Sequence, residues 1–566
     1  MILGIPVLLA LAINQARASP STNLAVSSQI CNKIQYDFPA GTNKNDPRAE
    51  AVKKAYVREW KQYAEYAFPN DDLLPVTHNS TNDLFGWGAT IVDGIDTAIV
   101  MGLTDIVEQQ LKQIAAVDFT YAPRQTPGKS SSVVAFFDVN IRYIGGYVDR
   151  ITTCLRILCS DDLYSLLSAY DLINSGQFPN PYDKDLVETL LSQAKSLATA
   201  ITPVFDTVTG LPGGNLNFTT QKIVQSTTTV NGKTYNSTNT AQAGTMILEY
   251  YRLSDLTGDE SFRQQAQKAE EYLINPSPSP AFPGLIGTEL DTDTGNFITF
   301  DGGWEAGVDS FIEQYLIKTY VYDRDDSLSS ALRDFWVTTA ESSIEHIALH
   351  PYGNPNLTFL SQLDSDGNIM WSMDDYACFA GGNLLLGGKY LDRPDITDLG
   401  IKVSDSCHWL YNTTLTGLGP SIVNSAIAWY NASNEAYESA YNTNATYRAE
   451  AAKYGYFIED PSYTSYPEPL ESIFYAYRVT GDTRWQDYNW EIFQALNTTR
   501  SASVPYAEIT DVNAPYGGEL VNYVSSFYFA EVLKYLYLTF TEPDVVSLDT
   551  FVFNTECHPV LIKKTC

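Results

Sequence analysis

Apolar residues recur along most of this chain with the spacing of amphipathic helices. The segments TDIVEQQLKQIAAV (104–117) and LYSLLSAYDLI (163–173) place apolar side chains three and four residues apart. This spacing predicts helices that bury one face. Strand-like alternation of apolar and polar residues is scarce and short. The pattern therefore favours an all-α fold.

Two longer segments share a rhythm that predicts paired helices. In 250–273 and in 475–496, an aromatic-rich helix ends at Thr-Gly and a second helix follows at once. The glycine suits the C-cap of the first helix, and the aspartate after it suits the cap of the second. The capping residues predicted in this way are Gly258, Asp259, Gly481 and Asp482.

Repeated helix pairs either stack into an open solenoid or close into a ring. The connecting loops are long and carry Gly, Asn and aromatic residues, as in TGLPGGNLNF (209–218) and FDGGWEAGVDSF (300–311). Loops of this kind usually carry function. We therefore expect a closed toroid of paired helices with long loops at the active-site end.

The first residues, MILGIPVLLALAINQARASP, predict a secretory signal peptide over residues 1–18. The apolar run is shorter than the roughly 20 residues that span a bilayer, and Ala16, Arg17 and Ala18 form an A-x-A cleavage site. We expect residues 19–44 to be an N-terminal extension and residues 45–566 to form a single domain.

Glycosylation sequons and cysteines agree with a secretory route. No later segment predicts a transmembrane helix, so the mature protein is expected to be secreted, or held in the lumen of the ER or Golgi, without stable membrane insertion. Seven cysteines are too sparse for a disulfide scaffold and suit a few bridges on a larger core. Eight sequons are present, at Asn79, Asn217, Asn236, Asn356, Asn412, Asn431, Asn444 and Asn497.

Charge and composition exclude several classes of partner and site. The 566 residues carry a net charge of -32, which repels phosphate backbones and argues against nucleic acid as a partner. The chain has only five histidines, and no Cys/His spacing resembles a zinc site. The chemistry is therefore sought among the carboxylates.

Several acids interrupt apolar helical stripes. Asp309 and Glu313 are spaced i, i+4 on one predicted face, and Glu531 lies in the middle of an aromatic stripe with Phe527 and Tyr535. One explanation is a solvated acidic face on a very acidic protein. The other is a buried site, because an apolar stripe does not otherwise accept a carboxylate.

Glu468 stands before the apolar run of SYPEPLESIFYAYRVTGD, which starts at Ser465. A capping box between Ser465 and Glu468 is one interpretation. Pro469 argues against it and favours a helix that starts at Pro469. Glu471 then lies in the first turn, and Glu468 lies beside the positive helix end, which would keep it ionised as a general base requires.

Several carboxylates, many aromatic residues, few histidines and no phosphate loop favour glycoside hydrolysis. That reaction needs a carboxylic acid, a carboxylate and aromatic surfaces for sugars. The sequence also resembles the class I α-1,2-mannosidases, glycoside hydrolase family 47, from about residue 45 onward. The motifs that carry the resemblance are GWGATIVDGIDTAIVMGL, FFDVNIRYIGG, TGLP, AGTMILEYYRLSDLTGD, GVDSFIEQYLIK, CFAGGNLLLGGK, PEPLESIFYAYRVTGD, FYFAEVLKYLYLTF and VFNTECHP.

The resemblance implies an (αα)7 barrel and inverting hydrolysis of terminal α-1,2-linked mannose on high-mannose N-glycans or glycoproteins. It also implies one Ca2+ in the barrel, and we expect a monomer. The family's proposed catalytic acids fall on Asp138, Asp309 and Glu468. Thr555 matches the threonine that binds Ca2+ through two oxygens.

Other pocket residues follow from the same resemblance. The residues expected to bind substrate are Arg142, Glu313, Glu471, Phe527 and Glu531. Glu471, Glu531 and Glu556 match carboxylates that hold the calcium's waters. Cys378 and Cys407 match the family's disulfide.

Four positions depart from the family pattern. Asp138 and Gln242 stand where the family has Glu, Asp375 aligns with a His, and Tyr466 replaces an Arg. An alternative to the enzyme is therefore a weakly active or non-catalytic protein that binds mannose glycans, for example in quality control, on the same barrel.

Overall fold

Helices packed in pairs make up most of the chain in its computed structural model, which describes residues 33–122, 132–143, 164–312, 316–421, 426–430, 443–498 and 504–563. Seven inner helices can be distinguished in these ranges, each packed against an outer helix. The inner helices are α3 (Ile95–Val100), α6 (Tyr164–Asn174), α9 (Ile247–Thr257), α11 (Leu316–Tyr322), α13 (Phe379–Tyr390), α17 (Glu468–Thr480) and α19 (Leu533–Phe540). Their outer partners, in the same order, are α4 (Thr104–Ala116), α7 (Lys184–Ile201), α10 (Glu260–Ile274), α12 (Ser329–Ser342), α14 (Pro394–Asn412), α18 (Arg484–Thr498) and α1 (Pro47–Tyr66).

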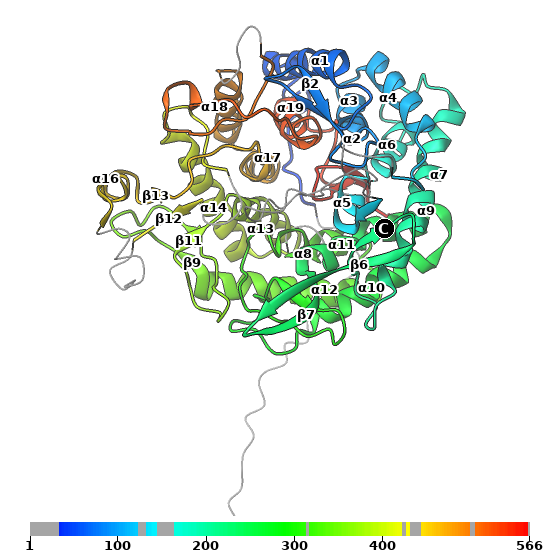
Figure 1. The fold of residues 1–566 in the computed structure, drawn as a ribbon. Coiled ribbons are helices and arrows are strands. Elements are labelled where there is room, and N and C mark those ends of the chain that lie inside the picture. The colour runs from blue at the N-terminus through cyan, green and yellow to red at the C-terminus, as the bar shows by residue number, and fades with distance from the viewer. Residues whose placement is uncertain are drawn as a thin grey trace, which may run out of the picture. The chain divides into compact units, whose positions relative to one another are not determined.

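The inner helices form a closed ring. Each contacts the next from α3 to α19, and the π-helical turn η6 (Tyr528–Val532), which leads into α19, contacts α3. In Figure 1 the colours follow this ring, and the red-orange α19 lies beside the blue α1. The predicted all-α toroidal barrel of paired helices is therefore confirmed.

Burial separates the inner from the outer helices. Every side chain from Glu468 to Val479 on the inner helix α17 is buried, whereas the outer helix α10 buries one stripe. Inner helices also approach neighbouring outer helices closely. A Cβ on Gly387 of α13 would lie 2.2 Å from the ring of Trp336 on α12, so only glycine fits there.

The helix caps follow the predicted rhythm. Gly258 and Gly481 end α9 and α17 in the left-handed region, at φ 70° and 72°. Asp259 accepts a hydrogen bond from the Ser261 amide at 3.3 Å, and Asp482 accepts one from the Arg484 amide at 3.0 Å. Both aspartates therefore stabilise the start of the following outer helix.

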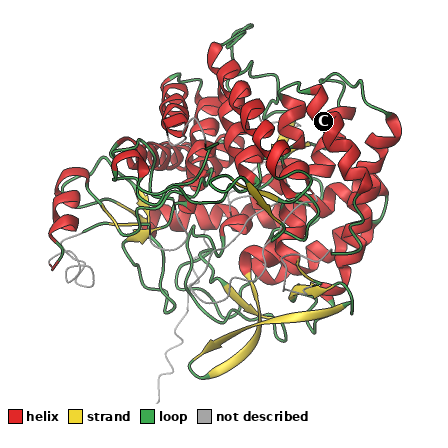
Figure 2. Cartoon of the chain, turned by 45° about the horizontal axis from the view of Figure 1, so that its top comes forward, coloured by secondary structure: helices red, strands yellow, loops and turns green. Residues whose placement is uncertain are grey.

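The sequence pattern did not predict a five-stranded antiparallel sheet, visible in Figures 1 and 2. Asn231 and Gly232, both at positive φ, form the turn between its two longest strands. An Asn-Gly pair is the strongest short-range signal of a hairpin in a sequence. The strands, in spatial order, are β3 (Val133–Ala135), β5 (Gly214–Asn217), β6 (Lys222–Val230), β7 (Lys233–Asn239) and β8 (Glu289–Asp291).

The remaining elements are short. The helical ones are α2 (Ala89–Asp93), α5 (Phe136–Ile141), η1 (Thr202–Phe205), α8 (Thr240–Gly244), η3 (Ser343–Ile347), η4 (Tyr376–Cys378), α16 (Ala445–Tyr454) and η5 (Pro515–Gly517). The strands are β1 (Asp72–Leu74), β2 (Asn79–Thr81), β9 (Ala348–Leu349), β10 (Phe359–Leu360), β11 (Ser372–Met373), β12 (Ile427–Ala428), β13 (Phe457–Ile458), β14 (Phe551–Phe553) and β15 (Pro559–Leu561).

The hairpin of β14 and β15 lies inside the ring of inner helices. β14 contacts α11, β15 contacts α6, and the Phe553 ring packs 5.8 Å from that of Phe474 on α17. The turn between the strands is buried. Its backbone is held by the Asn554 side chain, which accepts hydrogen bonds from the amides of Glu556 and His558 at 3.0 and 2.8 Å. We call residues 551–561 the hairpin plug.

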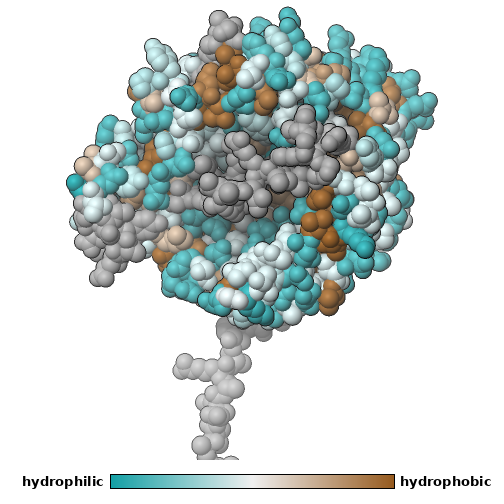
Figure 3. Space-filling model, viewed as in Figure 1, coloured by the Kyte–Doolittle hydropathy of each residue, from teal (hydrophilic) through white to brown (hydrophobic). Residues whose placement is uncertain are grey.

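Residues 33–44 pack on later parts of the described chain. The Ile34 amide donates to Asp549 at 2.8 Å, and the Asn43 amide side chain donates to the Tyr477 hydroxyl at 3.0 Å. The predicted signal peptide lies outside the described residues. None of the described helices combines the length and the apolar character needed to cross a membrane. The face in Figure 3 is largely hydrophilic, in keeping with the acidic composition.

Two buried carboxyl groups meet between α9 and α10. Glu249 and Glu270 are both fully buried, and neither Glu270 oxygen has a hydrogen-bond partner in the described parts of the chain. Burial, with the Glu249 charge acting in the same direction, raises the pKa of Glu270 well above its usual value. Glu270 is thus held in its neutral form far above the pH at which an exposed glutamate ionises.

Glu270→Gln is expected to stabilise the fold at alkaline pH. Because the folded-state pKa of Glu270 is raised, its stabilising effect is complete below the unfolded-state pKa and is lost as pH rises through the folded-state value. The variant should gain about 1–2 kcal/mol in free energy of unfolding near pH 8, and little near pH 4, about the usual glutamate pKa. Denaturant unfolding of both proteins at these pH values measures this; a gain independent of pH would contradict it.

Candidate active site

Six buried side chains form an apolar cluster that is separate from the main core. The rings of Tyr376, Tyr466 and Phe527 pack one after another in tilted contacts, with centroids 4.5 and 5.6 Å apart. We call the six residues the apolar wall, and they are Phe137, Ala241, Ala306, Tyr376, Tyr466 and Phe527. They come from six separate segments, and the candidate acids are their sequence neighbours. The wall therefore marks where the loops and helix starts of the barrel converge.

Glu468 is the first residue of α17, one position earlier than the sequence predicted, and Pro469 follows it at the second position. The capping-box interpretation is wrong, because the Ser465 hydroxyl hydrogen-bonds with the Tyr506 hydroxyl instead. Pro469 lacks an N–H and so suits the first turn, where amides have no intrahelical partner. The local sequence thus places the Glu468 carboxyl at the junction between loop and helix.

The pKa of Glu468 is raised well above its usual value, against the expectation that the helix end keeps it ionised. Burial is the largest cause, and the carboxylates of Asp375, Glu471 and Asp309 act in the same direction. The Glu468 backbone N–H at the helix start opposes them only in part. Burial among like charges therefore outweighs the helix terminus.

The other candidate catalytic acids are buried as well. Asp138, on α5, is 4% exposed, and Asp309 is 3% exposed and accepts a hydrogen bond from the Ser310 amide. Glu531, on the π-helical turn η6, is also buried. A solvated acidic face is therefore wrong for Asp309 and Glu531. Glu313 lies outside the described residues.

The turn of the hairpin plug brings Thr555 to these acids. The Thr555 hydroxyl oxygen lies 3.5 Å from that of Ser310, which follows Asp309. Burial raises the pKa of Glu556 to about 7, although Arg142 opposes the shift. Burial and the neighbouring Glu556 also raise the pKa of Glu531. The carboxyl groups of Glu531 and Glu556, the Thr555 hydroxyl and buried backbone therefore meet at the hairpin plug.

Lysine and arginine reach the same region from inside the ring. Lys318 Nζ lies 3.4 Å from a Glu471 carboxylate oxygen, and both side chains are buried. Arg142 donates to the Ser526 hydroxyl at 3.2 Å and lies 3.7 Å from a Glu556 oxygen. Its guanidinium carbon also lies 5.1 Å from the centre of the Phe527 ring. Arg142 thus joins the apolar wall to the hairpin plug.

A buried network of charges beneath the site was not predicted from the sequence. Lys534 Nζ lies 2.7 Å from an Asp96 oxygen, and His558 contacts Asp96 at 2.7 Å and Asp93 at 3.1 Å. All four side chains are fully buried. The signal was present as charged residues inside the apolar runs GWGATIVDGIDTAIVMGL and FYFAEVLKYLYLTF. We call Asp93, Asp96, Lys534 and His558 the charge network.

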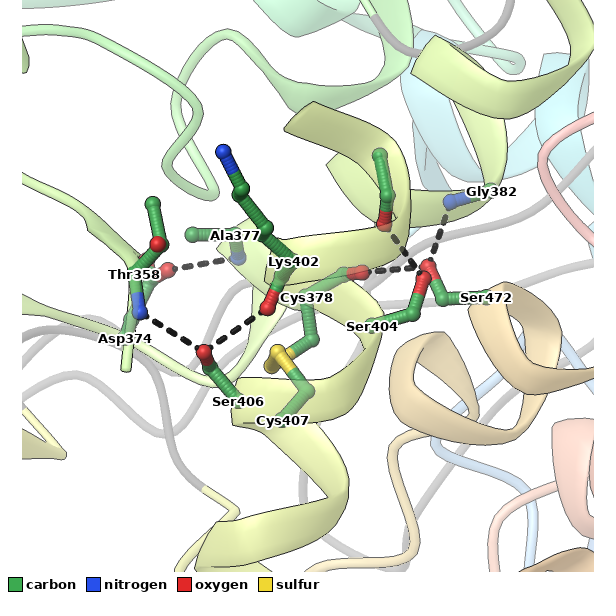
Figure 4. The surroundings of a disulfide bond; sticks show 11 residues. Thr358, Asp374, Ala377, Cys378, Gly382, Lys402, Ser404, Ser406, Cys407 and Ser472 are labelled. Atoms are coloured by element: carbon green, nitrogen blue, oxygen red, sulfur yellow. Dashed lines mark hydrogen bonds between the residues drawn. A yellow bond between two sulfur atoms is a disulfide. The ribbon is translucent and has the colours of Figure 1, made fainter. Parts of the chain in front are cut away.

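A disulfide anchors the segment beside the wall, as the resemblance implied. Cys378, at the end of η4, is bonded to Cys407 on α14 (Figure 4). Ser472 of α17 donates to the Cys378 carbonyl and accepts from the Gly382 amide. These bonds tie η4 to α17. Cys557 is buried without a disulfide, and the remaining cysteines lie outside the described residues.

The positions that depart from the family pattern also lie around the pocket. Tyr466 is part of the apolar wall, and Asp375 is 1% exposed directly before η4. Gln242 is half-buried on α8, beside Ala241 of the wall.

Glu305, next to Ala306 of the apolar wall, was not predicted from the sequence. Burial and the charge of Asp374 raise the pKa of Glu305.

Comparisons with known proteins agree with this arrangement. The family described as Glycosyl hydrolase family 47 matches residues 55–562. A "Probable mannosyl-oligosaccharide alpha-1,2-mannosidase 1B" of Aspergillus clavatus is 40% identical over 528 residues, covering 91% of this chain and 93% of that protein. A "Mannosyl-oligosaccharide alpha-1,2-mannosidase" of Penicillium citrinum is 38% identical over 533 residues, covering 92% and 93%.

A solved structure supports the same assignment. The "alpha-1,2-mannosidase from Trichoderma reesei" has a TM-score of 0.79 and 37% identity to this chain, and the match covers 91% of this chain and 99% of that one. The family match spans most of the sequence. The chain belongs to glycosyl hydrolase family 47.

Proposed function

We propose that this protein removes terminal α-1,2-linked mannose from high-mannose oligosaccharides and N-glycans with inversion at the anomeric carbon. The observation that carries the proposal is the convergence of buried acids on one apolar wall, in a chain that is 38–40% identical to proteins named α-1,2-mannosidases. Inverting hydrolysis requires one carboxylic acid and one carboxylate that activates water. Asp138, Asp309 and Glu468 supply the candidates.

The chain's own residues suit this chemistry. Aromatic rings of the apolar wall offer a flat surface to the apolar face of a sugar, and Arg142 is held beside Phe527 by its contacts with Ser526 and Glu556. Burial raises the pKa of Glu468, so this carboxyl group releases its proton at higher pH than an exposed one does. We assign Asp138 as the general acid and Glu468 as the general base.

The plug region fits a calcium ion. In the described ranges, no three His, Cys, Asp or Glu side chains form a metal site by themselves, so the ion would rely on Thr555 oxygens and on water. Glu471, Glu531 and Glu556 would hold that water, since hard oxygen donors suit calcium. One oxygen each of Glu531 and Glu556 has no hydrogen-bond partner among the described atoms. When bound, the ion would supply positive charge to the pocket and an anchor for sugar hydroxyl groups.

Calcium removal and Thr555→Ala test the function together. The parent is expected to release mannose from an α-1,2-mannobiose unit, and a chelator should suppress the release. Thr555→Ala removes one of the two threonine oxygens and should weaken calcium affinity at least tenfold, about 1.4 kcal/mol, with a parallel loss of mannose release. Isothermal titration calorimetry and a mannose assay measure the two effects.

Thr555→Ser is the matched control, because it keeps the hydroxyl and should retain both calcium binding and activity. Unchanged calcium affinity in Thr555→Ala would show that any ion binds elsewhere. Glycan binding without mannose release by the parent would favour the alternative function, a non-catalytic glycan-binding protein. This alternative is motivated by the four positions that depart from the family pattern, Asp138, Gln242, Asp375 and Tyr466.

The setting of the enzyme is part of the proposal. The predicted signal peptide and the sequons support entry into the secretory pathway, with release from the cell or retention in the ER or Golgi lumen. The substrate would then be a glycoprotein or a free high-mannose oligosaccharide, and the protein would act as a monomer. The strongly acidic composition supports the absence of a nucleic-acid partner.

A further inference from the structure

Polar side chains without ordinary hydrogen bonds gather behind Glu468. Both carboxylate oxygens of Asp375 are buried, and no hydrogen bond of ordinary geometry reaches them from the described residues. The same holds for the hydroxyls of Tyr411, Ser421 and Tyr463, and for Glu468 Oε2. Buried polar atoms are nearly always satisfied, so a group of five such residues indicates bound water or shared protons.

The fold holds these residues together. Ser421 pairs with Tyr463 in a parallel β-bridge. The Ser421 carbonyl accepts a hydrogen bond from the Thr464 hydroxyl at 2.6 Å. Asp375 directly precedes η4, which packs against α17. The Ser472 hydroxyl of α17 donates to the Cys378 carbonyl and ties η4 to α17, and the disulfide ties η4 to α14. Tyr376, the residue after Asp375, packs its ring 4.5 Å from that of Tyr466, two positions before Glu468, which places Asp375 on the side of the start of α17.

We propose that Asp375 is a positioning residue that shares one proton with Glu468 across a buried polar chamber formed with Tyr411, Ser421 and Tyr463. The inference rests on the proposed function, because it assigns Glu468 to the reaction. A single proton bound by the two carboxyl groups leaves one negative charge in place of two. No other bond forms or breaks when this proton moves between them.

The electrostatics agree with this arrangement. Burial and then Asp375 are the largest causes of the raised pKa of Glu468. Burial likewise raises the pKa of Asp375 well above its usual value, while the nearby Ser421 hydroxyl favours the ionised form. Like carboxyl groups that share a site bind a proton between them, because both cannot ionise cheaply. The other charged or titratable groups that face the pair are Asp309, Asp374, Glu471, Glu531, Tyr376, Tyr411 and Tyr463.

The pH profile of kcat/KM tests the proposal. Asp375→Asn removes the second carboxylate, so Glu468 should lose its proton at lower pH. The inflection that Glu468 causes should move down by about one pH unit or more, whether Glu468 acts as base or as acid. Asp375→Glu keeps the charge and should leave the inflection near that of the parent. Glu270→Gln, a buried carboxyl group far from this chamber in sequence, should not move it. An unchanged inflection in Asp375→Asn would overturn the proposal.

Infrared titration of carboxyl groups gives a readout that needs no activity. Spectra of each variant subtracted from those of the parent should show a protonated carboxyl component that persists to unusually high pH in the parent and is lost at lower pH in Asp375→Asn and in Glu468→Gln, whereas the contribution of Glu270 cancels. Either variant alone suffices if the other does not fold. Bands that titrate identically in the parent and both variants would refute proton sharing. If the parent releases no mannose but the variants lose this band at lower pH, the proposed function is overturned and the proton-sharing pair of Asp375 and Glu468 is retained.

Discussion

Asp138→Asn is expected to lower kcat for mannose release by about three orders of magnitude, within the range typical of a lost proton-transfer group. The amide cannot donate the proton that the leaving sugar needs. Asp138→Glu is expected to raise kcat, because aspartate is shorter by one carbon–carbon bond, about 1.5 Å. A displacement of about 1 Å can cost on the order of a hundredfold in rate. Single-turnover assays on a defined high-mannose glycan measure both changes.

Folding and calcium binding serve as the controls for both Asp138 variants. Asp138 is 4% exposed, so thermal unfolding must show that the longer glutamate is accommodated. Neither substitution touches Thr555, and calcium affinity should stay at the parental value. If Asp138→Asn hydrolyses mannosides as fast as the parent, Asp138 is not the acid. Glycan binding without release by all three proteins would favour the binding protein over the enzyme.

Lys534→Met is expected to lower the free energy of unfolding by about 3–5 kcal/mol, the usual cost of leaving a buried charge without its partner. Lys534 is fully buried, contacts Asp96 at 2.7 Å and donates to the Cys557 carbonyl at 2.8 Å. Burial would raise the pKa of Asp96, but Lys534 and His558 more than offset it and hold the pKa low. Denaturant unfolding followed by circular dichroism measures the loss.

Two further variants separate charge pairing from packing. Lys534→Met combined with Asp96→Asn removes both charges and should recover a large part of the loss, since replacing a whole buried pair is often nearly neutral. Lys112→Met removes an exposed partner of Glu108 on α4 and should cost less than about 1 kcal/mol. A loss of that small size for Lys534→Met would show that Asp96 is satisfied by His558 alone.

The sequence predicted the elements whose signals are local. The caps at Gly258 and Gly481 and the amphipathic helices each depend on a few neighbouring residues, and the structure has them where expected. The hairpin of β6 and β7 was not predicted, because its strands are mostly Thr, Ser, Lys and Asn and neither face of the hairpin is apolar. Only its Asn231-Gly232 turn was informative.

Features that depend on distant contacts could not be predicted in this way. Periodicity cannot show that Lys534 meets Asp96, because those residues belong to opposite ends of the chain. Nor could the helix terminus alone decide the ionisation of Glu468, because its pKa depends on carboxylates that the fold gathers from three other positions. The assignments of Asp138, Asp309 and Thr555 came from family resemblance, and they remain predictions until the variants are measured.

The hairpin plug links the site to the order in which the chain is made. His558 contacts Asp93 from 465 positions further along the sequence, and Thr555 belongs to the same turn. On a ribosome, the inner helices up to α17 emerge before the residues proposed to hold calcium and before His558 and Lys534, which neutralise Asp93 and Asp96. Closing so long a loop is also slow relative to local folding. The nascent protein would therefore remain inactive until synthesis is nearly complete, which would delay trimming of neighbouring glycans until the barrel has matured.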